Sequence, residues 1–253
     1  TFITMPKNNL NNLRQAFIDC DIEVERFIST TFALGVELLN ENEFQFGSVL
    51  LDIGFEKVSL GLFKNFALVH SITFPIGINH LTKDISKVCS LSLAESENIK
   101  NNINFTFKDN NEMFDENDYL KNSFFIDSSF RKISKSLILD VAKARLDEIF
   151  KIIKKQLLVN KLNSKFTTNF FIVGGGSNLL NLENYCSNIF KSKVKKLNTI
   201  NKEKEGNYKK KLFACLGALK IVKDGWETEA IPEPVGKNGQ KLSFFERIFK
   251  NKL

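Results

Sequence analysis

An apolar segment that runs directly into three consecutive glycines constrains the fold of this chain more than any other feature. Phe170-Phe171-Ile172-Val173 has the composition of a buried strand, and Gly174-Gly175-Gly176-Ser177 follows at once. Three glycines in a row cost conformational entropy, so such a turn is typical of places where another group approaches the backbone closely. The turn precedes a predicted helix, whose first backbone N–H groups can bind an anion or a nucleotide. Alternatively, Ser177 is only a helix N-cap.

Hydrophobic periodicity along the rest of the chain predicts an α/β fold. Strands that we expect to share one sheet cover Ser48–Ile53, Lys57–Phe63, Ala67–Phe74 and Asn169–Val173. Further short strands are predicted at Asp21–Val24, Asn104–Lys108 and Ser123–Ile126. Helices are predicted at Asn8–Cys20, Thr31–Leu39, Leu81–Val88, Leu93–Lys100, Ser136–Leu158, Leu179–Phe190 and Leu212–Val222. With 253 residues, the chain is long enough for one large domain or two small lobes.

The charge and the cysteines restrict the class of protein. A net charge of +7 permits anionic partners, and many of the lysines lie between Lys191 and Lys211. That stretch is interpreted as a solvated face, because no nucleic-acid-binding motif accompanies it, and nucleic acid is not expected as a partner. Cysteines 20, 89, 186 and 215 form no CxxC pair, which favours buried free thiols in the reducing cytoplasm. His70 and His80 lack metal-ligand spacing, so no metal site and no catalytic residue is predicted.

Two further motifs are candidates for nucleotide contacts. Asp52-Ile53-Gly54 ends a predicted strand. An acidic side chain there can hold a metal-bound water near a phosphate, and the glycine lets backbone N–H groups approach it. The alternative is an ordinary hairpin turn. Glu97 and Lys100 lie three positions apart on one helix face, where they can hydrogen-bond a ribose or simply form a surface ion pair.

The last residues have the pattern of a membrane-surface helix. Residues 226–240 are rich in proline and glycine and are predicted to be a linker. At helical spacing, one side of residues 241–253 carries Leu242, Phe244, Phe245, Ile248, Phe249 and Leu253. Arg247 and Lys250 face the other way. A phenylalanine-rich face with basic flanks suits the headgroup boundary of an anionic membrane. The alternative is a helix that packs on a protein.

Six motifs follow one another in a fixed order. They are Leu51-Asp52-Ile53-Gly54, Phe74-Pro75-Ile76-Gly77 with Thr82-Lys83-Asp84-Ile85, Glu97-Asn98-Ile99-Lys100, Ala144-Arg145-Leu146-Asp147-Glu148-Ile149, Val173-Gly174-Gly175-Gly176-Ser177 and Ala214-Cys215-Leu216-Gly217. This order resembles the FtsA family of bacterial cell-division proteins, which is part of the actin-like ATPase superfamily. It implies an actin-like (ribonuclease H-like) fold. In that fold, residues 1–47 are the remnant of an incomplete first lobe, 48–211 are the second lobe with a subdomain at about 90–139, 212–225 are a closing helix and 241–253 are a membrane-targeting helix.

The resemblance also implies the function. ATP with Mg²⁺ is the implied cofactor, held by Asp52, Gly54, Glu97, Lys100 and Gly174–Ser177. The implied partners are the acidic and apolar C-terminal peptide of FtsZ, further copies of the chain and an anionic membrane. The implied location is the cytoplasmic face of the cell membrane at the division site. Arg131, Lys132 and Lys135 are the candidates for meeting the acidic peptide, unless they serve only solubility.

One motif departs from the family pattern. The second phosphate loop of the family reads Asp-Ile-Gly-Gly-Gly-Thr-Thr-Asp, whereas this chain has Asp52-Ile53-Gly54-Phe55-Glu56-Lys57-Val58-Ser59. Glu56 is expected to repel a phosphate, and little ATPase activity is expected. The first phosphate loop, Asp-x-Gly-Thr/Ser, is absent, which indicates the C-terminal portion of a longer protein. Two alternatives are an actin-like adaptor of type IV pilus assembly and an ATP-dependent kinase of the same superfamily.

Overall fold

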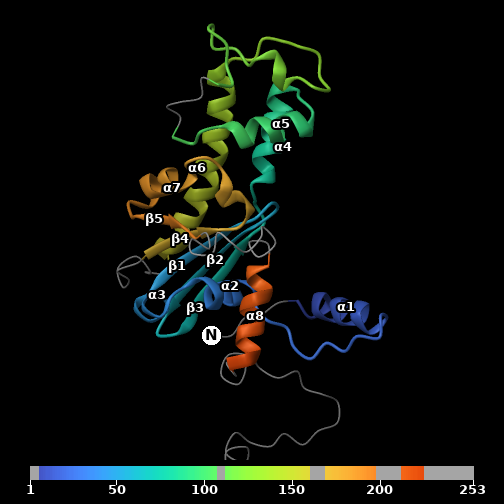
Figure 1. Ribbon diagram of the computed structural model, residues 1–253, viewed down its shortest axis with the longest axis vertical. Coiled ribbons are helices and arrows are strands. Elements are labelled where there is room, and N and C mark those ends of the chain that lie inside the picture. Colours follow the sequence, from blue (N-terminus) through green and yellow to red (C-terminus); the bar gives the residue numbers. More distant parts are fainter. Residues whose placement is uncertain (1–5, 107–111, 160–168, 198–211, 225–253) are drawn as a thin grey trace, which may run out of the picture. The chain divides into compact units, whose positions relative to one another are not determined.

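The computed structural model describes residues 6–106, 112–159, 169–197 and 212–224 (Figure 1). The described residues fall into two compact units, residues 29–224 and residues 6–28. The predicted linker and the predicted membrane helix lie outside the described residues, as does most of the lysine-rich stretch. None of the described helices is both long enough and apolar enough to cross a bilayer.

The centre of the larger unit is a five-stranded sheet in the order β3-β2-β1-β4-β5. Its strands are β1 Ser48–Ile53, β2 Val58–Lys64, β3 Ala67–Phe74, β4 Asn169–Val173 and β5 Val194–Lys196. β1, β2 and β3 pair in antiparallel fashion, whereas β4 lies parallel to β1 and to β5. The prediction that the first four of these strands share one sheet is confirmed. β5 was not predicted, because three residues reading Val-Lys-Lys carry no strand pattern.

Helices surround this sheet, and their bounds follow the predicted ones closely. In the larger unit they are α2 Thr30–Leu38, α3 Glu41–Phe46, α4 Asn79–Cys89, α5 Leu93–Asn102, α6 Lys135–Val159, α7 Leu182–Phe190 and α8 Phe213–Asp224, with short 3-10 turns η1 Asn122–Phe124 and η3 Gly175–Asn178. α3 was not predicted, although Asn40 and Glu43 form the capping box that begins it.

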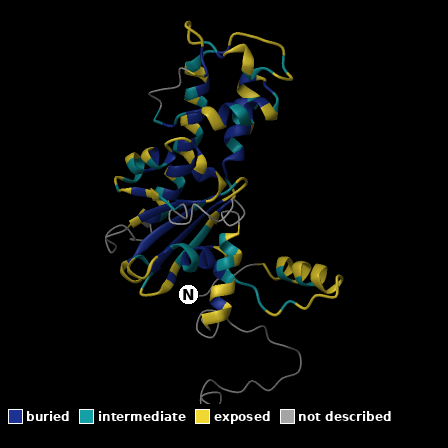
Figure 2. Ribbon diagram, viewed as in Figure 1, coloured by how far each residue is buried: buried dark blue, intermediate teal, exposed yellow. Residues whose placement is uncertain are grey.

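Both faces of the central strands β1 and β2 are covered, so these strands are buried at nearly every position (Figure 2). Val49, Leu51 and Ile53 join the core cluster with residues of α4, α5 and α6. Successive side chains of a strand point to opposite faces, so the buried Leu50 points away from that cluster. On the opposite face Phe63 of β2 packs under α2, where a Cβ added at Gly35 would lie 2.3 Å from its ring.

α8 closes the larger unit by packing against α2. A Cβ added at Gly217 of α8 would lie 1.9 Å from the carbonyl oxygen of Ala33, so only glycine permits this approach. Nζ of Lys220 lies 2.7 Å from Oε2 of Glu37 on the facing helix. The Ala-x-x-Gly pattern in the sequence therefore has a packing reason, which is the contact between these two helices.

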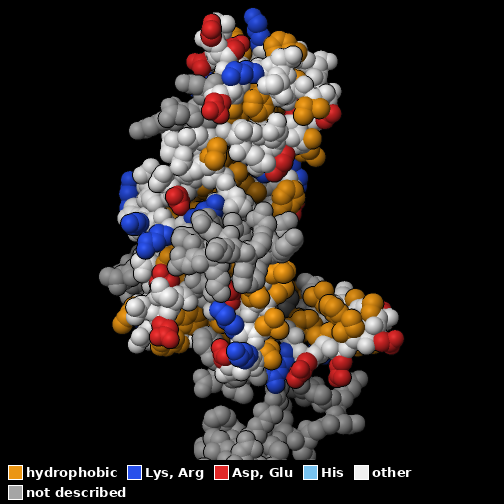
Figure 3. All heavy atoms as spheres, in the orientation of Figure 1, with side chains coloured by type: hydrophobic (Ala, Val, Ile, Leu, Met, Phe, Trp, Pro, Cys, Tyr) orange, Lys and Arg blue, Asp and Glu red, His pale blue; other side chains and the backbone are white. Residues whose placement is uncertain are grey.

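The smaller unit contains α1, Lys7–Ile18, with no buried residue. Figure 3 shows hydrophobic side chains gathered on this helix, and Leu13, Phe17 and Ile18 are exposed. The prediction of a strand at Asp21–Val24 is wrong. Asp21 has a φ of 57°, and the backbone N–H groups of Asp21 and Ile22 donate to the last turn of α1. These bonds end the helix and leave an extended segment that pairs with no described strand.

Two other expectations fail in the larger unit. Ser123–Ile126 is not a strand, because residues 122–124 form η1 and the N–H of Ile126 donates to the side chain of Glu95. Within Asn104–Lys108, residues 104–106 form no strand, and residues 107 and 108 lie outside the described part.

All four cysteines are free, but the expectation of buried thiols holds only for Cys89 and Cys186, because the other two are exposed.

Candidate functional site

The glycine turn lies beside the end of β1, because β4 and β1 are parallel and end at the same edge. Asp52 is the register partner of Val173. Gly174 has a φ of 84°, and a Cβ there would lie 2.4 Å from Oδ1 of Asp52. Gly175 differs, because an added Cβ would meet no atom within 4 Å. The turn is therefore packed against β1 at Gly174 and open at Gly175, where another group can approach the backbone.

Ser177 stabilises this turn from inside. It is buried, and its Oγ donates to the carbonyl oxygen of Gly174 at 2.7 Å. The predicted helix Leu179–Phe190 starts later than expected, at Leu182, because residues 175–178 form the 3-10 turn η3. Ser177 is thus neither the N-cap of a long helix nor an exposed ligand donor, and the open backbone at Gly175 is the part of the turn that suits a nucleotide.

Asp52 is held in a partly buried position at the same edge. Burial raises the pKa of its carboxyl group, and the positive charge of Lys57 opposes that rise. A carboxyl group that resists ionisation is a weak ligand for Mg²⁺. Among the residues that the structure describes, no group of three or more His, Cys, Asp or Glu side chains is placed to hold a metal ion.

The β1–β2 turn, residues 54–57, is packed against the start of α4. The N–H of Gly54 donates to the carbonyl oxygen of Lys57 at 2.9 Å. Gly77, just before α4, approaches so closely that an added Cβ would lie 2.3 Å from the carbonyl oxygen of Phe55. The Pro-x-Gly segment of the sequence is thus explained by contact with this turn.

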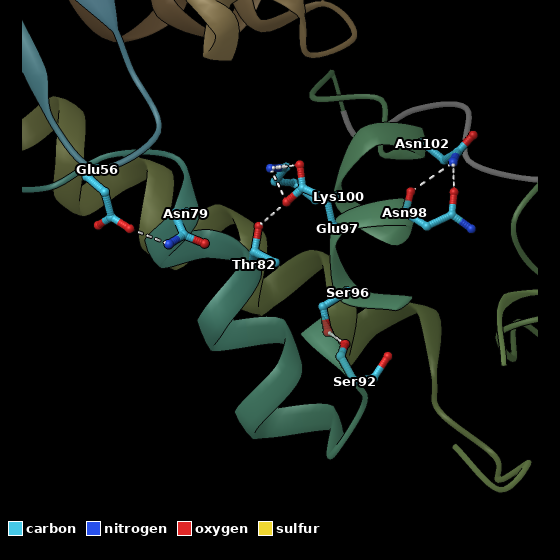
Figure 4. Close-up of polar contacts among 9 residues, drawn as sticks. All are labelled: Glu56, Asn79, Thr82, Ser92, Ser96, Glu97, Asn98, Lys100 and Asn102. Atoms are coloured by element: carbon cyan, nitrogen blue, oxygen red, sulfur yellow. Dashed lines mark hydrogen bonds and ion pairs between the residues drawn. The ribbon is translucent and has the colours of Figure 1, made fainter. Parts of the chain in front are cut away.

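α4 carries a row of polar side chains from the β1–β2 turn to α5 (Figure 4). Asn79 donates from Nδ2 to Oε1 of Glu56 at 2.6 Å. One helical turn further on, Thr82 donates from Oγ1 to Oε2 of Glu97 at 2.6 Å. Residues three apart share a face of a helix, so both contacts lie on the same side of α4.

Glu97 and Lys100 are bound to each other. Nζ of Lys100 lies 2.6 Å from both carboxylate oxygens of Glu97. The lysine side chain is 2% exposed, whereas that of Glu97 is 40% exposed. Burial raises the pKa of Glu97, but the hydrogen bonds from Lys100 and Thr82 outweigh it and lower the pKa. The ion pair considered from the sequence is therefore buried on its lysine side and partly exposed on its glutamate side. Glu97 is the member of the pair with an exposed part, which a ribose hydroxyl can reach.

The structure brings the predicted nucleotide residues together in two groups. Asp52, Gly54 and the glycine turn form one group at the edge of the sheet, and Glu97 with Lys100 forms the other beside α4. The features expected to face the nucleoside, the glycine turn and Glu97, fit one, because Gly175 is open and Glu97 is accessible. The phosphate-facing features, which are the β1–β2 turn and Asp52 as expected from the sequence, do not fit, because Glu56 puts a negative charge on the turn that a phosphate would approach.

An ion pair joins two motifs to which the family resemblance assigned no role, namely residues 82–85 and 144–149. Arg145 of α6 donates from Nη2 to Oδ1 of Asp84 on α4 at 2.9 Å, and its Nε donates to Oδ2. These hydrogen bonds raise the pKa of Arg145. The Thr-x-Asp-Ile and Ala-Arg-x-x-Glu-Ile patterns therefore hold α4 against α6, and so they position the polar row of α4.

Replacing Arg145 by alanine is expected to lower the free energy of unfolding by about 1.5–3 kcal/mol, the range for hydrogen bonds to a charged group. Arg145→Lys should recover little, because an ammonium cannot form the two-pronged contact. In a double-mutant cycle with Asp84→Ala, measured by urea unfolding, the coupling energy should exceed about 0.5 kcal/mol. Additive effects of the two substitutions would show that this pair does not join the helices.

The family model and the curated relatives that match this chain belong to the same family. A sequence model described as "Cell division protein FtsA" matches residues 49–216, which is more than half of the chain. The cell division protein FtsA of Buchnera aphidicola subsp. Acyrthosiphon pisum (strain APS) is 26% identical over 271 residues, which cover 98% of this chain and 59% of that protein. FtsA of Bacillus subtilis (strain 168) is 26% identical over 157 residues, which cover 62% of this chain and 35% of that protein. The chain thus spans less than two thirds of the length of these relatives.

Solved structures of the same fold are more distant in sequence. MreB5 of Spiroplasma citri bound to ADP matches with a TM-score of 0.61 at 15% identity, covering 88% of this chain and 68% of that one. The PilM–PilN type IV pilus biogenesis complex matches with a TM-score of 0.59 at 17% identity, covering 84% and 57%. These matches show the fold alone, and the prediction of an α/β actin-like fold is confirmed.

Proposed function

We propose, from the premise that this chain belongs to the FtsA family of cell-division proteins, that it is an adaptor between FtsZ and the membrane. In this proposal it binds the C-terminal peptide of FtsZ, associates with copies of itself and lies at the cytoplasmic face of the cell membrane at the division site. The fold it shares with the pilus protein PilM does not distinguish the two roles, whereas the match to the FtsA family favours division.

The observation that carries the proposal is a lobe with exposed apolar and basic side chains. This docking lobe consists of α4, α5 and residues 112–135. Leu93, Ile126 and Phe130 are large apolar side chains that are exposed there. They lie on segments that are bound together, because the N–H of Ile126 donates to Glu95 and the guanidinium of Arg131 donates to the carbonyl oxygen of Ser90. A peptide that is both apolar and acidic suits such a surface.

The three basic residues predicted for this role are not equivalent. Arg131 and Lys132 are exposed, and Nζ of Lys132 lies 5.5 Å from the centre of the Tyr119 ring. Lys135 is partly buried in its own lobe, where Nζ lies 3.1 Å from Oδ1 of Asp118. We therefore propose Arg131 and Lys132 as the residues that meet the acidic groups of the peptide, and Lys135 as a residue that stabilises the lobe.

Attachment to the membrane is proposed for residues 241–253, which lie outside the described part of the chain. The support is their sequence pattern, with Leu242, Phe244, Phe245, Ile248 and Phe249 on one side and Arg247 and Lys250 on the other. One helix of this kind binds only weakly, so association of several chains is part of the proposal. Catalysis is not part of it, because the phosphate-facing features of the site do not fit ATP.

Titration of a labelled FtsZ C-terminal peptide against the full chain tests the docking lobe. Lys132→Glu is expected to weaken binding about tenfold, equivalent to about 1.4 kcal/mol, because it places a like charge opposite the peptide. Lys151→Glu, an exposed site on α6, is the matched control and should leave affinity unchanged. Equal affinity of both variants and the unmodified chain would exclude this surface as the dock.

A further inference from the structure

We propose that Glu56 occupies the anion-binding position at the start of α4, so that the chain closes its own phosphate-facing turn and gains no affinity from nucleotide phosphates. The inference stands apart from the tethering role, which does not depend on the β1–β2 turn. It disagrees with what the fold implies, since solved structures of the fold include MreB5 of Spiroplasma citri bound to ADP and to AMPPNP.

The backbone donors at the start of α4 are already used within the protein. The first turn of a helix normally presents free N–H groups that can bind a phosphate. Here the N–H of Ile78 donates to the carbonyl oxygen of Gly54 at 3.0 Å, and the N–H of Asn79 donates to that of Phe55 at 2.8 Å. The neighbouring N–H groups donate to acceptors inside the same segment. The N–H of Gly77 donates to Nδ1 of His80, and the N–H of His80 donates to the carbonyl oxygen of Gly77. The N–H of Leu81 donates to the carbonyl oxygen of Ile78.

Glu56 adds a carboxylate at the same place. Its Oε1 accepts the 2.6 Å hydrogen bond from Asn79, the first residue of α4 (Figure 4). The same oxygen lies 3.6 Å from Nζ of Lys83. The hydrogen bond from Asn79 is the main cause that lowers the pKa of Glu56, and Lys83 adds to it. The group is therefore ionised at neutral pH, and a negative charge at a helix N-terminus is favourable.

The turn cannot move away from α4 without losing these contacts. Gly77 lies against it so closely that an added Cβ would be 2.6 Å from the backbone nitrogen of Lys57. The turn, the segment before α4 and the Glu56 carboxylate therefore form one closed unit that is held by the chain's own groups. A phosphate entering here would meet the charge of Glu56 and would have to displace carbonyl groups from the N–H groups of Ile78 and Asn79.

The first test is thermal unfolding of the full chain with no ligand, with adenosine and with Mg-ATP at equal concentration. A ligand raises the unfolding midpoint according to its affinity for the folded state. The expected result is that Mg-ATP raises the midpoint no more than adenosine does. A clearly larger shift with Mg-ATP would overturn the proposal, and it would leave the peptide and membrane experiments unaffected.

The second test needs no ligand and follows hydrogen exchange of the amides of Ile78 and Asn79. In Glu56→Ala and in Asn79→Ala, exchange should be faster by about two- to five-fold, the size expected from loss of one partly exposed contact to a charged group. Asn79→Ala keeps the Glu56 carboxylate but removes its hydrogen-bond donor. This variant therefore distinguishes the effect of the hydrogen bond from the effect of the negative charge. Glu116→Ala, at an exposed glutamate of the docking lobe, is the control. Unchanged exchange in both α4-contact variants would overturn the proposal.

Discussion

Replacing Glu95 by alanine is expected to lower the free energy of unfolding by about 3–5 kcal/mol, because five partly buried hydrogen bonds lose their charged acceptor at once. The Glu95 side chain is fully buried. One of its oxygens accepts the backbone N–H groups of Ile126, Asp127 and Ser128 at 2.7, 2.9 and 2.8 Å. The other accepts the N–H of Ser92 and the hydroxyl of Ser128. This one carboxylate therefore ties α5 to the segment that carries the exposed apolar residues.

The same carboxylate predicts a dependence of stability on pH. Burial alone raises the pKa of Glu95, but the hydrogen bonds from Ser128, Ser92 and Ile126 outweigh it and place the pKa well below the ordinary value. A group whose pKa is lower in the folded state stabilises the fold above its unfolded pKa, about 4.3, and loses this contribution as the pH falls below that value. Because the amide introduced by Glu95→Gln does not titrate, the stability difference between the unmodified chain and this variant should shrink between about pH 5 and pH 3.

Urea unfolding of the unmodified chain, Glu95→Ala and Glu95→Gln at several pH values measures both effects. Glu116→Ala removes an exposed carboxylate from the same lobe and should change stability by less than about 0.5 kcal/mol. A loss below about 1 kcal/mol for Glu95→Ala, or a constant difference for Glu95→Gln across this pH range, would show that the carboxylate does not hold the lobe together.

Most of the sheet could be predicted from the sequence, because a strand that is buried on both faces carries apolar residues at most of its positions. Asn169–Val173 is apolar from its second residue onward and is followed by glycine, and β4 has these bounds. Ser123–Ile126 has similar composition, yet it is no strand, because the N–H of Ile126 finds a carboxylate 31 residues away. Composition records burial, but it does not record which acceptor a buried backbone group will find.

The glycine turn of the candidate site could be predicted from the sequence, but the long-range contacts around it could not. The glycines of the turn mark a close approach, and the structure places Gly174 against Asp52. The sequence shows that Glu56 is unfavourable for a phosphate, but its contact with Asn79 joins residues 23 positions apart and leaves no local pattern. The pairing of Asp84 with Arg145, 61 positions apart, is hidden for the same reason. Such contacts depend on how α4 crosses its neighbours, which only tertiary packing decides.

Phe245→Glu is expected to abolish sedimentation of the chain with anionic vesicles and to leave the two described units folded. Burial of a phenylalanine side chain contributes about 1.5–3 kcal/mol, and each basic residue near an anionic surface about 1 kcal/mol. Residues 241–253 therefore give weak binding per chain, and one buried charge is enough to remove it. Ser243→Glu is the matched control, because Ser243 lies on the polar side of the predicted helix and should retain most of the binding.

Deleting residues 240–253 should have the same effect as Phe245→Glu. Circular dichroism and the unfolding midpoint of the deleted chain check that the body remains folded. If the deleted chain still sediments with anionic vesicles, these residues are not the anchor, and the lysine-rich stretch Lys191–Lys211 becomes the candidate for membrane binding.

The most direct test of the adaptor function is a three-component sedimentation experiment with anionic vesicles, the full chain and a labelled FtsZ C-terminal peptide. The peptide should sediment with vesicles only when the chain is present. Lys132→Glu should reduce the amount of sedimented peptide, in line with the about tenfold weaker peptide binding, whereas Phe245→Glu should abolish its sedimentation. Lys132→Glu should leave the chain itself on the vesicles, whereas Phe245→Glu should leave the peptide bound to the chain in solution. If the unmodified chain binds the vesicles and the peptide stays in the supernatant, the chain is not an adaptor between FtsZ and the membrane.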